Sequence, residues 1–268
     1  MLPGTTHSRI LARTGVDWIC VDTEHGLLSD SNMHESVAAI AAVGISPVVR
    51  VAANEAWMVK RALDSGAHGI IVPLLQTADD AKRLVSSAKF PPQGTRGFGS
   101  PFPMEKFHAM YSDSSSLMGG KGGITQTQYL QQANEALVTI VQIETAEALA
   151  NVDAIAAVEG VDVLLIGPFD LGNNIGHPII DSIDQELKDA IAKIHAAAGK
   201  AGKRTGIYCT SGEQAREYAD AGFHMISCVT DAAVLGQASA EAVKKAQGGV
   251  MHSAYKGVKD GVSKMTYG

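Results

Sequence analysis

Two apolar runs in the middle of the chain each end in an acidic residue. VTIVQIE (138–144) ends in Glu144, and VDVLLIGPFD (161–170) ends in Asp170. Both runs are typical of buried strands, and a segment with helical spacing (146–160) separates them. Carboxylates on neighbouring parallel strands can hold a hard divalent cation, with water or substrate oxygens as the other ligands. The alternative is that both acids cap nearby helices or pair with Arg or Lys.

Residues beside these two acids could contact a substrate. Gln142 lies two positions before Glu144, so both side chains point to the same side of a strand. There Gln142 could bind a metal-bound water or the substrate itself. Gly167 and Pro168 precede Asp170 and would let a substrate approach the backbone closely.

A second acidic group, DTEHG, follows the apolar run DWICVD (17–22). Asp22 and His25 lie three positions apart, and a carboxylate that orients an imidazole makes a general base near neutral pH. The alternative is a histidine bonded only to backbone. Glu24 would support waters on a metal or be solvated.

Arg50 ends another apolar run, SPVVR, and an arginine at a strand end suits a carboxylate or enolate oxygen. A salt bridge to a neighbouring strand-end acid is the alternative. Well-defined predicted strands do not end in Lys, which argues against a Schiff-base aldolase. The sequence contains no Gly-x-Ser-x-Gly, Walker, His-x-His or His-Glu-x-x-His motif, which argues against serine hydrolase, P-loop and zinc sites.

The elements that must position these residues alternate between strands and helices. The pattern predicts strands near 17–22, 46–51, 69–74, 95–99, 138–144, 161–167, 204–209 and 224–229. Continuous apolar runs are typical of parallel strands covered on both faces, and this many strand–helix units favour a (β/α)8 TIM barrel. A doubly wound open sheet is the alternative. A barrel begins with a strand before its first helix, and that strand is missing ahead of the helix expected within 1–15.

Composition limits the other classes of function. Of 268 residues, 46% are hydrophobic, and 22 basic residues face 28 acidic ones without long runs of either sign. This balance predicts no basic patch that would bind nucleic acid or anionic lipid. Three cysteines without metal-type spacing predict free thiols in a reducing compartment. No signal peptide or bilayer-length apolar run is visible, so we expect a cytoplasmic protein without membrane contact.

The domain organisation expected from these patterns is simple. One barrel domain covers 1–247, and a Ser- and Gly-rich stretch within it (108–124) predicts an inserted, flexible surface loop. A polar tail follows at 248–268.

Ordered motifs across residues 5–245 resemble the HpcH/HpaI aldolase family. The resemblance rests on DWICVDTEHG, VVRV, IIVPLLQTADDA, FPPQGTRGFG, VQIET and IGPFDLGNNIGHP. It implies a metal-dependent class II pyruvate aldolase with a TIM barrel of the phosphoenolpyruvate/pyruvate superfamily type. Such an enzyme is a carbon–carbon lyase of the aldehyde-lyase class.

The resemblance also implies roles for individual residues. Glu144 and Asp170 would hold Mg²⁺ or Mn²⁺, with Co²⁺ also accepted. Gln142 would lie beside the pyruvyl group, and Arg50 would stabilise the enolate oxygen. His25, oriented by Asp22, would be the base, acting through a metal-bound water.

Two further implications concern substrate binding and assembly. Backbone amides from Gly167 to Leu171 would hold the substrate carboxylate. Asp64 stands where a neighbouring subunit contributes to the site in this family, whose members are commonly homohexamers built as trimers of dimers.

The implied reaction is reversible cleavage of 4-hydroxy-2-oxo acids, such as 4-hydroxy-2-oxoheptanedioate, to an aldehyde and pyruvate, with oxaloacetate decarboxylation as a side activity. One alternative is an enzyme of secondary metabolism that uses the same enolate to form a carbon–carbon bond with a pyrone. Another is a truncated, non-catalytic barrel that binds metabolites. A citrate-lyase-like thioester cleavage is weaker, because no CoA site is recognisable.

Overall fold

The computed structural model describes residues 1–100 and 126–247. The chain divides into two compact units, Met1–Cys228 and Val229–Gly268. The described part of the second unit contains helix α11 (Asp231–Gln247). The predicted loop at 108–124 and the tail at 248–268 lie outside the described residues. Among the described helices, none has the length and apolar character to cross a bilayer.

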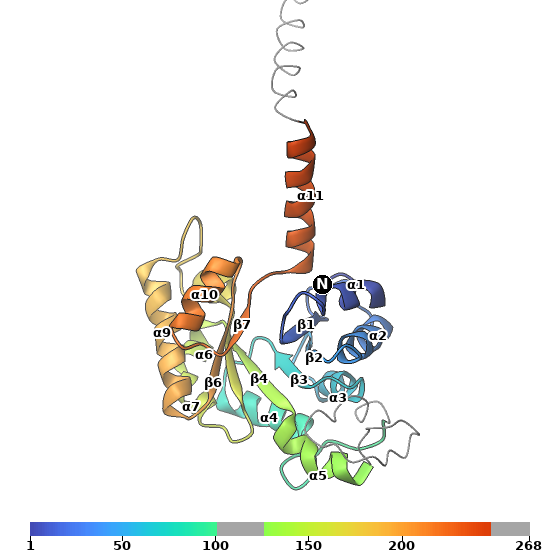
Figure 1. Cartoon of the computed structure of the whole chain (residues 1–268). Coiled ribbons are helices and arrows are strands. Elements are labelled where there is room, and N and C mark those ends of the chain that lie inside the picture. Colours follow the sequence, from blue (N-terminus) through green and yellow to red (C-terminus); the bar gives the residue numbers. More distant parts are fainter. Residues whose placement is uncertain (101–125, 248–268) are drawn as a thin grey trace, which may run out of the picture. The chain divides into compact units, whose positions relative to one another are not determined.

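The first unit is built on one parallel sheet whose strand order follows the chain. Its strands are β1 (Trp18–Asp22), β2 (Ser46–Arg50), β3 (Gly69–Val72), β4 (Val138–Ile143), β5 (Val163–Ile166), β6 (Arg204–Tyr208) and β7 (Met225–Ser227). A doubly wound sheet reverses its strand order, so this order excludes that alternative. The sheet curls into an incomplete barrel (Figure 1), and in the described residues β1 and β7 are not paired with each other.

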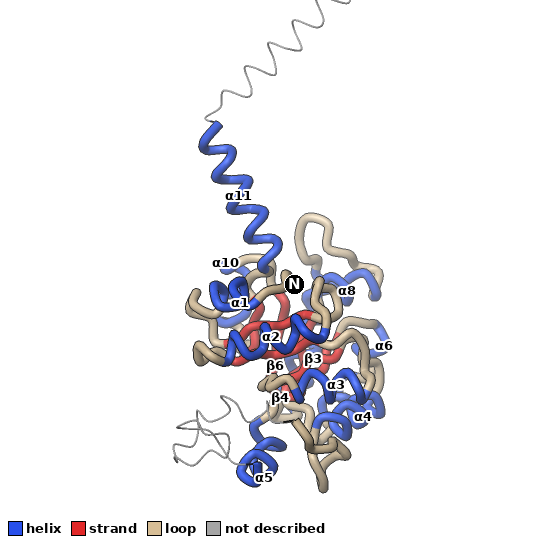
Figure 2. The backbone as a smooth tube through the Cα atoms, turned by 90° about the vertical axis from the view of Figure 1, so that its right-hand side faces the viewer, coloured by secondary structure: helices blue, strands red, loops and turns tan. Residues whose placement is uncertain are grey.

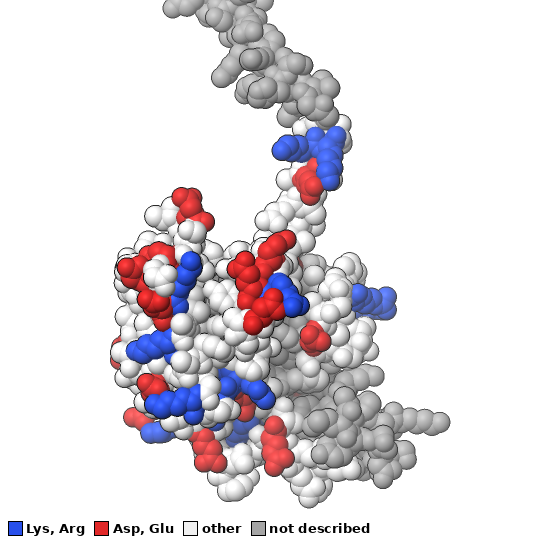
Figure 3. Space-filling model, turned by 60° about the vertical axis from the view of Figure 1, so that its left-hand side comes forward, with Lys and Arg blue, Asp and Glu red and all other residues white. Residues whose placement is uncertain are grey.

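Helices cover the convex face of the curled sheet (Figures 1 and 2). They are α1 (Thr5–Leu11), α2 (Asp30–Ala41), α3 (Ala56–Asp64), α4 (Ala78–Ala88), α5 (Gln126–Ala136), α6 (Ala146–Ala150), α7 (Val152–Ala156), α8 (Pro168–Asn174), α9 (Gln185–Lys200) and α10 (Gly212–Asp220). Thr77 and Ser211 are the N-caps of α4 and α10, since their side chains accept the N–H groups of Asp80 and Gln214. On the face shown in Figure 3, acidic and basic side chains of the first unit are interspersed.

Apolar side chains fill both faces of the sheet. The larger cluster lies between strands and helices, and a smaller one lies on the concave face, formed by Val48, Ile71, Ile140, Val163 and Leu165. Side chains two positions further along a strand point to the same face. Arg50, Gln142 and Gly167 therefore lie one layer above this inner cluster, at the C-terminal ends of their strands.

The prediction of a strand at 95–99 is wrong. This segment bonds back to the end of α4, because Thr95 N–H donates to Ser86 O at 2.7 Å and Arg96 N–H to Lys89 O at 3.0 Å. The buried Arg96 guanidinium also binds Asp64 at 3.0 Å. As a result β3 pairs directly with β4. Seven strands remain in the described residues and none precedes α1, so the expected TIM-barrel-like fold with a missing first strand is confirmed.

Candidate active site

Asp22 and Arg50 form the first part of the site. They are register partners at the ends of β1 and β2. Arg50 Nε donates to Asp22 Oδ1 at 2.9 Å, and Nη2 donates to Oδ2 at 2.6 Å, while Nε also lies 3.2 Å from Glu24 Oε2. Burial alone would raise the pKa of Asp22, but the hydrogen bonds and charge of Arg50 outweigh it and lower that pKa. The salt bridge that the sequence left open for Arg50 is therefore present.

His25 lies beside Glu24, which differs from the prediction that Asp22 orients its imidazole. Both Asp22 oxygens bind Arg50, and Oδ1 also accepts the backbone N–H groups of Glu24 at 3.1 Å and His25 at 3.4 Å. Asp22 thus fixes the backbone of the loop rather than the ring. The His25 side chain is 59% exposed, with Nε2 3.7 Å from Glu24 Oε2. This exposure leaves the imidazole accessible to a substrate.

Glu144 is the most deeply enclosed acid of the site. It is 3% exposed, its Oε1 accepts the Leu74 N–H at 2.8 Å, and its Oε2 accepts the Gln142 amide. Burial raises the pKa of Glu144, and the negative charges of Asp170 and Glu24 act in the same direction. A buried carboxylate is costly unless it is paired, and these two hydrogen bonds offset part of that cost.

Leu74 is a site residue that the sequence did not reveal. It has φ +54°, the left-handed conformation that a branched, non-glycine residue rarely adopts. This conformation accompanies the bond from its N–H to Glu144. Strain of this kind is retained where surrounding structure enforces it, often at functional sites. The stretch around Leu74 contains no glycine or asparagine that would have signalled it.

Gly167 is packed directly against these side chains. A Cβ at this position would lie 2.7 Å from Glu144 Oε2 and 3.0 Å from Gln142 Nε2. The Gly167 backbone therefore lies directly against the Glu144 and Gln142 side chains, and Pro168 follows as the first residue of α8. Close approach of a substrate to this backbone stays a prediction. Leu171 is different, because its N–H donates to Gly167 O at 2.9 Å and its side chain is fully buried. That amide closes the first turn of α8 and is not available for a substrate carboxylate.

The charges of the site do not balance. Four carboxylates, on Asp22, Glu24, Glu144 and Asp170, influence one another through their charges. Among the described residues, Arg50 is the guanidinium that contacts Asp22 and Glu24. Burial raises the pKa of Glu24, and the charges of Asp22 and Asp170 add to this effect, whereas Arg50 and His25 oppose it.

An unused acceptor lies in the same place. The buried Gln142 Oε1 has no hydrogen-bond partner among the described residues. Several carboxylate oxygens and an amide oxygen with excess negative charge form the donor set that a hard divalent cation prefers.

Asp64 is held within its own chain. Its carboxylate binds Arg96, and its carbonyl accepts the Ser100 hydroxyl at 2.8 Å. Its assignment to a neighbouring subunit's site stays a prediction.

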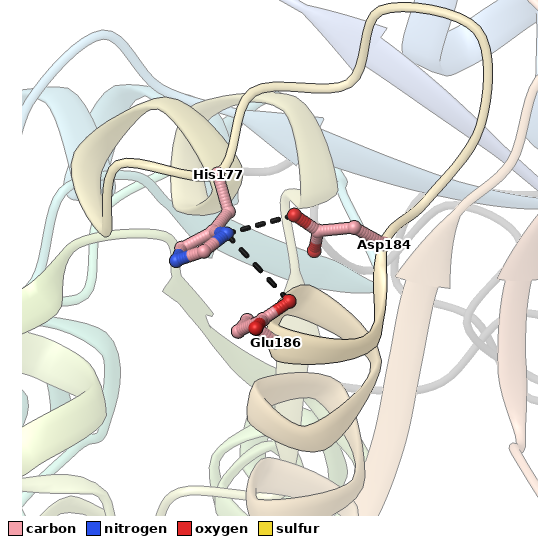
Figure 4. A group of neighbouring side chains, drawn as sticks. All are labelled: His177, Asp184 and Glu186. Atoms are coloured by element: carbon pink, nitrogen blue, oxygen red, sulfur yellow. Dashed lines mark hydrogen bonds and ion pairs between the residues drawn. The ribbon is translucent and has the colours of Figure 1, made fainter.

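His177, Asp184 and Glu186 form a separate group of potential ligands (Figure 4). His177 Nδ1 lies 2.7 Å from Asp184 Oδ2 and 3.8 Å from Glu186 Oε2. Asp184 is also the N-cap of α9, since its Oδ1 accepts the Leu187 N–H at 2.9 Å. These contacts join the loop after α8 to the start of α9 and do not involve the Glu144 site.

Comparison with known proteins identifies relatives of this chain. The model of the HpcH/HpaI aldolase/citrate lyase family matches residues 2–238. A hydroxypyruvate/pyruvate aldolase of Rhizorhabdus wittichii is 37% identical over 92% of this chain and 91% of its own length. A 4-hydroxy-2-oxo-heptane-1,7-dioate aldolase of Salmonella dublin is 32% identical over 88% of this chain and 84% of its own. The crystal structure of macrophomate synthase shares the fold, with a TM-score of 0.76 and 24% identity, over 92% of this chain and 82% of that one.

Proposed function

Because the chain belongs to the HpcH/HpaI aldolase/citrate lyase family and is therefore an aldolase, a carbon–carbon lyase, we propose that it cleaves 4-hydroxy-2-oxo acids in a cation-dependent reaction. The products are pyruvate and an aldehyde, and 4-hydroxy-2-oxoheptanedioate is one such substrate. The observation that carries this proposal is the group of carboxylates that follow β1, β4 and β5, with Asp22 and Glu144 buried and Asp170 exposed. Among the described residues, Arg50 is the cation that contacts Asp22 and Glu24.

Glu144 and Asp170 are the residues that would hold the cation. Their oxygens suit Mg²⁺ or Mn²⁺, and Co²⁺ would fit the same donors. When bound, the cation supplies electrostatic stabilisation of negative charge on the substrate's 2-oxo oxygen. The unpartnered Gln142 Oε1 and the close approach of Gly167 support a polar ligand at this place.

The chain's own residues perform the proton and charge steps. His25, exposed at the mouth, accepts the proton of the 4-hydroxyl group. The C3–C4 bond then breaks, its electron pair moves to C3, and the aldehyde leaves the pyruvate enolate behind. Arg50 stabilises the enolate oxygen with its positive charge, while Asp22 fixes the direction of the guanidinium. Decarboxylation of oxaloacetate gives the same enolate without a hydroxyl proton to remove.

Two measurements test this mechanism. Pyruvate release should stop in EDTA and return with Mg²⁺ or Mn²⁺, so full activity in chelator would refute the cation requirement. His25→Ala should lower cleavage about 100-fold or more relative to oxaloacetate decarboxylation, since general bases contribute about 10²–10⁴-fold. Equal loss of both activities would show that His25 is not the base.

For assembly and location we propose a homohexamer, a trimer of dimers, in the cytoplasm, without nucleic acid or membrane partners. The family resemblance supports this assembly. Light scattering of the full chain should give six times its 28.0 kDa mass. A monomeric mass would contradict the hexamer.

A further inference from the structure

Phe169 and Tyr208 form an aromatic pair beside the carboxylates. Phe169 stands between Pro168 and Asp170 in the first turn of α8, and Tyr208 ends β6. Their ring centroids are 6.3 Å apart, with an interplanar angle of 62°, an edge-to-face arrangement. Phe169 is 44% exposed, so part of its ring surface is open to a ligand.

Tyr208 belongs to the same layer as the site residues. A Cβ at Gly206, two positions earlier, would touch Leu165 Cδ1 at 2.7 Å, and Leu165 is part of the inner apolar cluster. Side chains of Gly206 and Tyr208 therefore point to the concave face of the sheet. Tyr208 lies above that cluster at the C-terminal end of its strand, as Gln142 and Gly167 do on β4 and after β5. The pair thus lies at the same end of the sheet as Gln142 and Gly167.

Charge at the mouth favours an uncharged group beyond C4. Arg50, the cation that contacts the site carboxylates, is already bound to Asp22 and Glu24. A second carboxylate on the aldehyde would be repelled by the charges of these carboxylates, whereas an uncharged group would not. Other loops after the strands add apolar surface, since Leu27 is 77% exposed and Leu74 is 57% exposed.

We propose that Phe169 and Tyr208 form the subsite for the aldehyde portion of the substrate, and that this portion is aromatic. The inference rests on the proposed aldol cleavage and narrows its substrate class. A ring at C4 packs against the exposed face of Phe169 and the edge of Tyr208. Among 4-hydroxy-2-oxo acids, a 4-phenyl compound is then preferred to the carboxylated heptanedioate.

The test compares kcat/KM for pyruvate release from three substrates with full-length enzyme. They are 4-hydroxy-2-oxo-4-phenylbutanoate, 4-hydroxy-2-oxopentanoate and 4-hydroxy-2-oxoheptanedioate. The wild type should prefer the phenyl compound. Phe169→Ala should lower kcat/KM for the phenyl compound about 3- to 10-fold relative to the pentanoate, the range expected for one lost aromatic contact.

Control variants separate the subsite from general damage. Tyr208→Phe keeps the ring and should keep the preference, whereas Tyr208→Ala should reduce it. Ile10→Ala removes a side chain that is 62% exposed on α1 and should leave the ratio as in wild type. Thermal melts of all variants establish that they fold.

The outcomes distinguish the two proposals. If none of the three acids is cleaved, the proposed function fails, and the subsite fails with it. If they are cleaved but the heptanedioate is preferred, or Phe169→Ala lowers all three equally, only the aromatic subsite is refuted.

Discussion

Gly167→Ala tests how tightly the backbone is packed against the site. Gly167 has φ −98° and ψ 89°, which alanine can adopt, so the substitution introduces no backbone strain. The new methyl group would lie 2.7 Å from Glu144 Oε2 and 3.0 Å from Gln142 Nε2. Real Cβ contacts stay beyond 3.0 Å, so the Glu144 carboxylate must move by at least 0.3 Å. The perturbation thus acts directly on the proposed cation ligand.

The size of the effect follows from this displacement. Functional groups must be held within about 0.5 Å of their productive positions, and a shift of about 1 Å costs about 100-fold in rate. A displacement of at least 0.3 Å on this scale predicts that kcat/KM for pyruvate release falls at least about 4-fold. Overpacking costs about 1–3 kcal/mol of stability, since Glu144 is also held by the Leu74 N–H and cannot move freely.

The assay combines kinetics, cation titration and thermal melts with a matched control. Gly199→Ala adds the same methyl group in α9, where no atom lies within 4 Å. It should keep wild-type activity and gain about 0.5–1 kcal/mol, as expected for glycine to alanine in a helix. If Gly167→Ala retains wild-type kcat/KM and cation affinity, the reasoning about close packing is refuted.

Three further predictions concern charge and stability. In the folded protein the pKa of Asp22 lies below its usual value, so the stability that Asp22 contributes is fully present above about pH 3.8 and is lost as the pH falls through the folded pKa. The difference in melting temperature between wild type and Asp22→Asn should therefore shrink in acid. A difference that stays constant with pH would contradict this. Lys89 is buried, and its Nζ donates to the carbonyls of Asn134 at 2.6 Å and Leu137 at 2.8 Å. Lys89→Met should therefore lower the free energy of unfolding, measured with denaturant, by about 1–3 kcal/mol. An unchanged unfolding midpoint would refute this. Mg²⁺ at about 100 times its dissociation constant should stabilise the wild type by about 2.7 kcal/mol; Glu144→Gln should lose this gain, and a retained gain would place the cation elsewhere.

Local sequence patterns predicted the elements well but not the contacts between them. The strand ends that carry Glu144 and Arg50 follow from apolar runs, which depend on neighbours in sequence. The weak apolar run at 95–99 indicated a strand that the structure does not contain. Its backbone binds the end of α4, and the buried Arg96 side chain binds Asp64 at the end of α3. The partners of Arg96 lie between seven positions (Lys89) and 32 positions (Asp64) earlier in the chain and leave no periodic signal.

The sequence also did not reveal the hydrogen-bond partners of individual groups in the site. Asp22 and His25 are three positions apart, which suggested a pair, yet Arg50 from the neighbouring strand offers a bidentate guanidinium and takes both oxygens. The Leu74 N–H reaches Glu144 across 70 positions, and its left-handed conformation has no mark in the sequence.

By itself, the sequence determined the order of strands and helices, the missing first strand, and which acids stand at strand ends. These features depend on side-chain period and chain order, and a parallel sheet brings all its C-terminal ends to one edge. Only the tertiary structure showed that Asp22 binds Arg50 and that Glu144 is buried against Gln142 and Leu74. It also showed that the rings of Phe169 and Tyr208 are in contact. Those choices depend on distances between strands, on burial, and on competition between charges, which no single stretch of sequence contains.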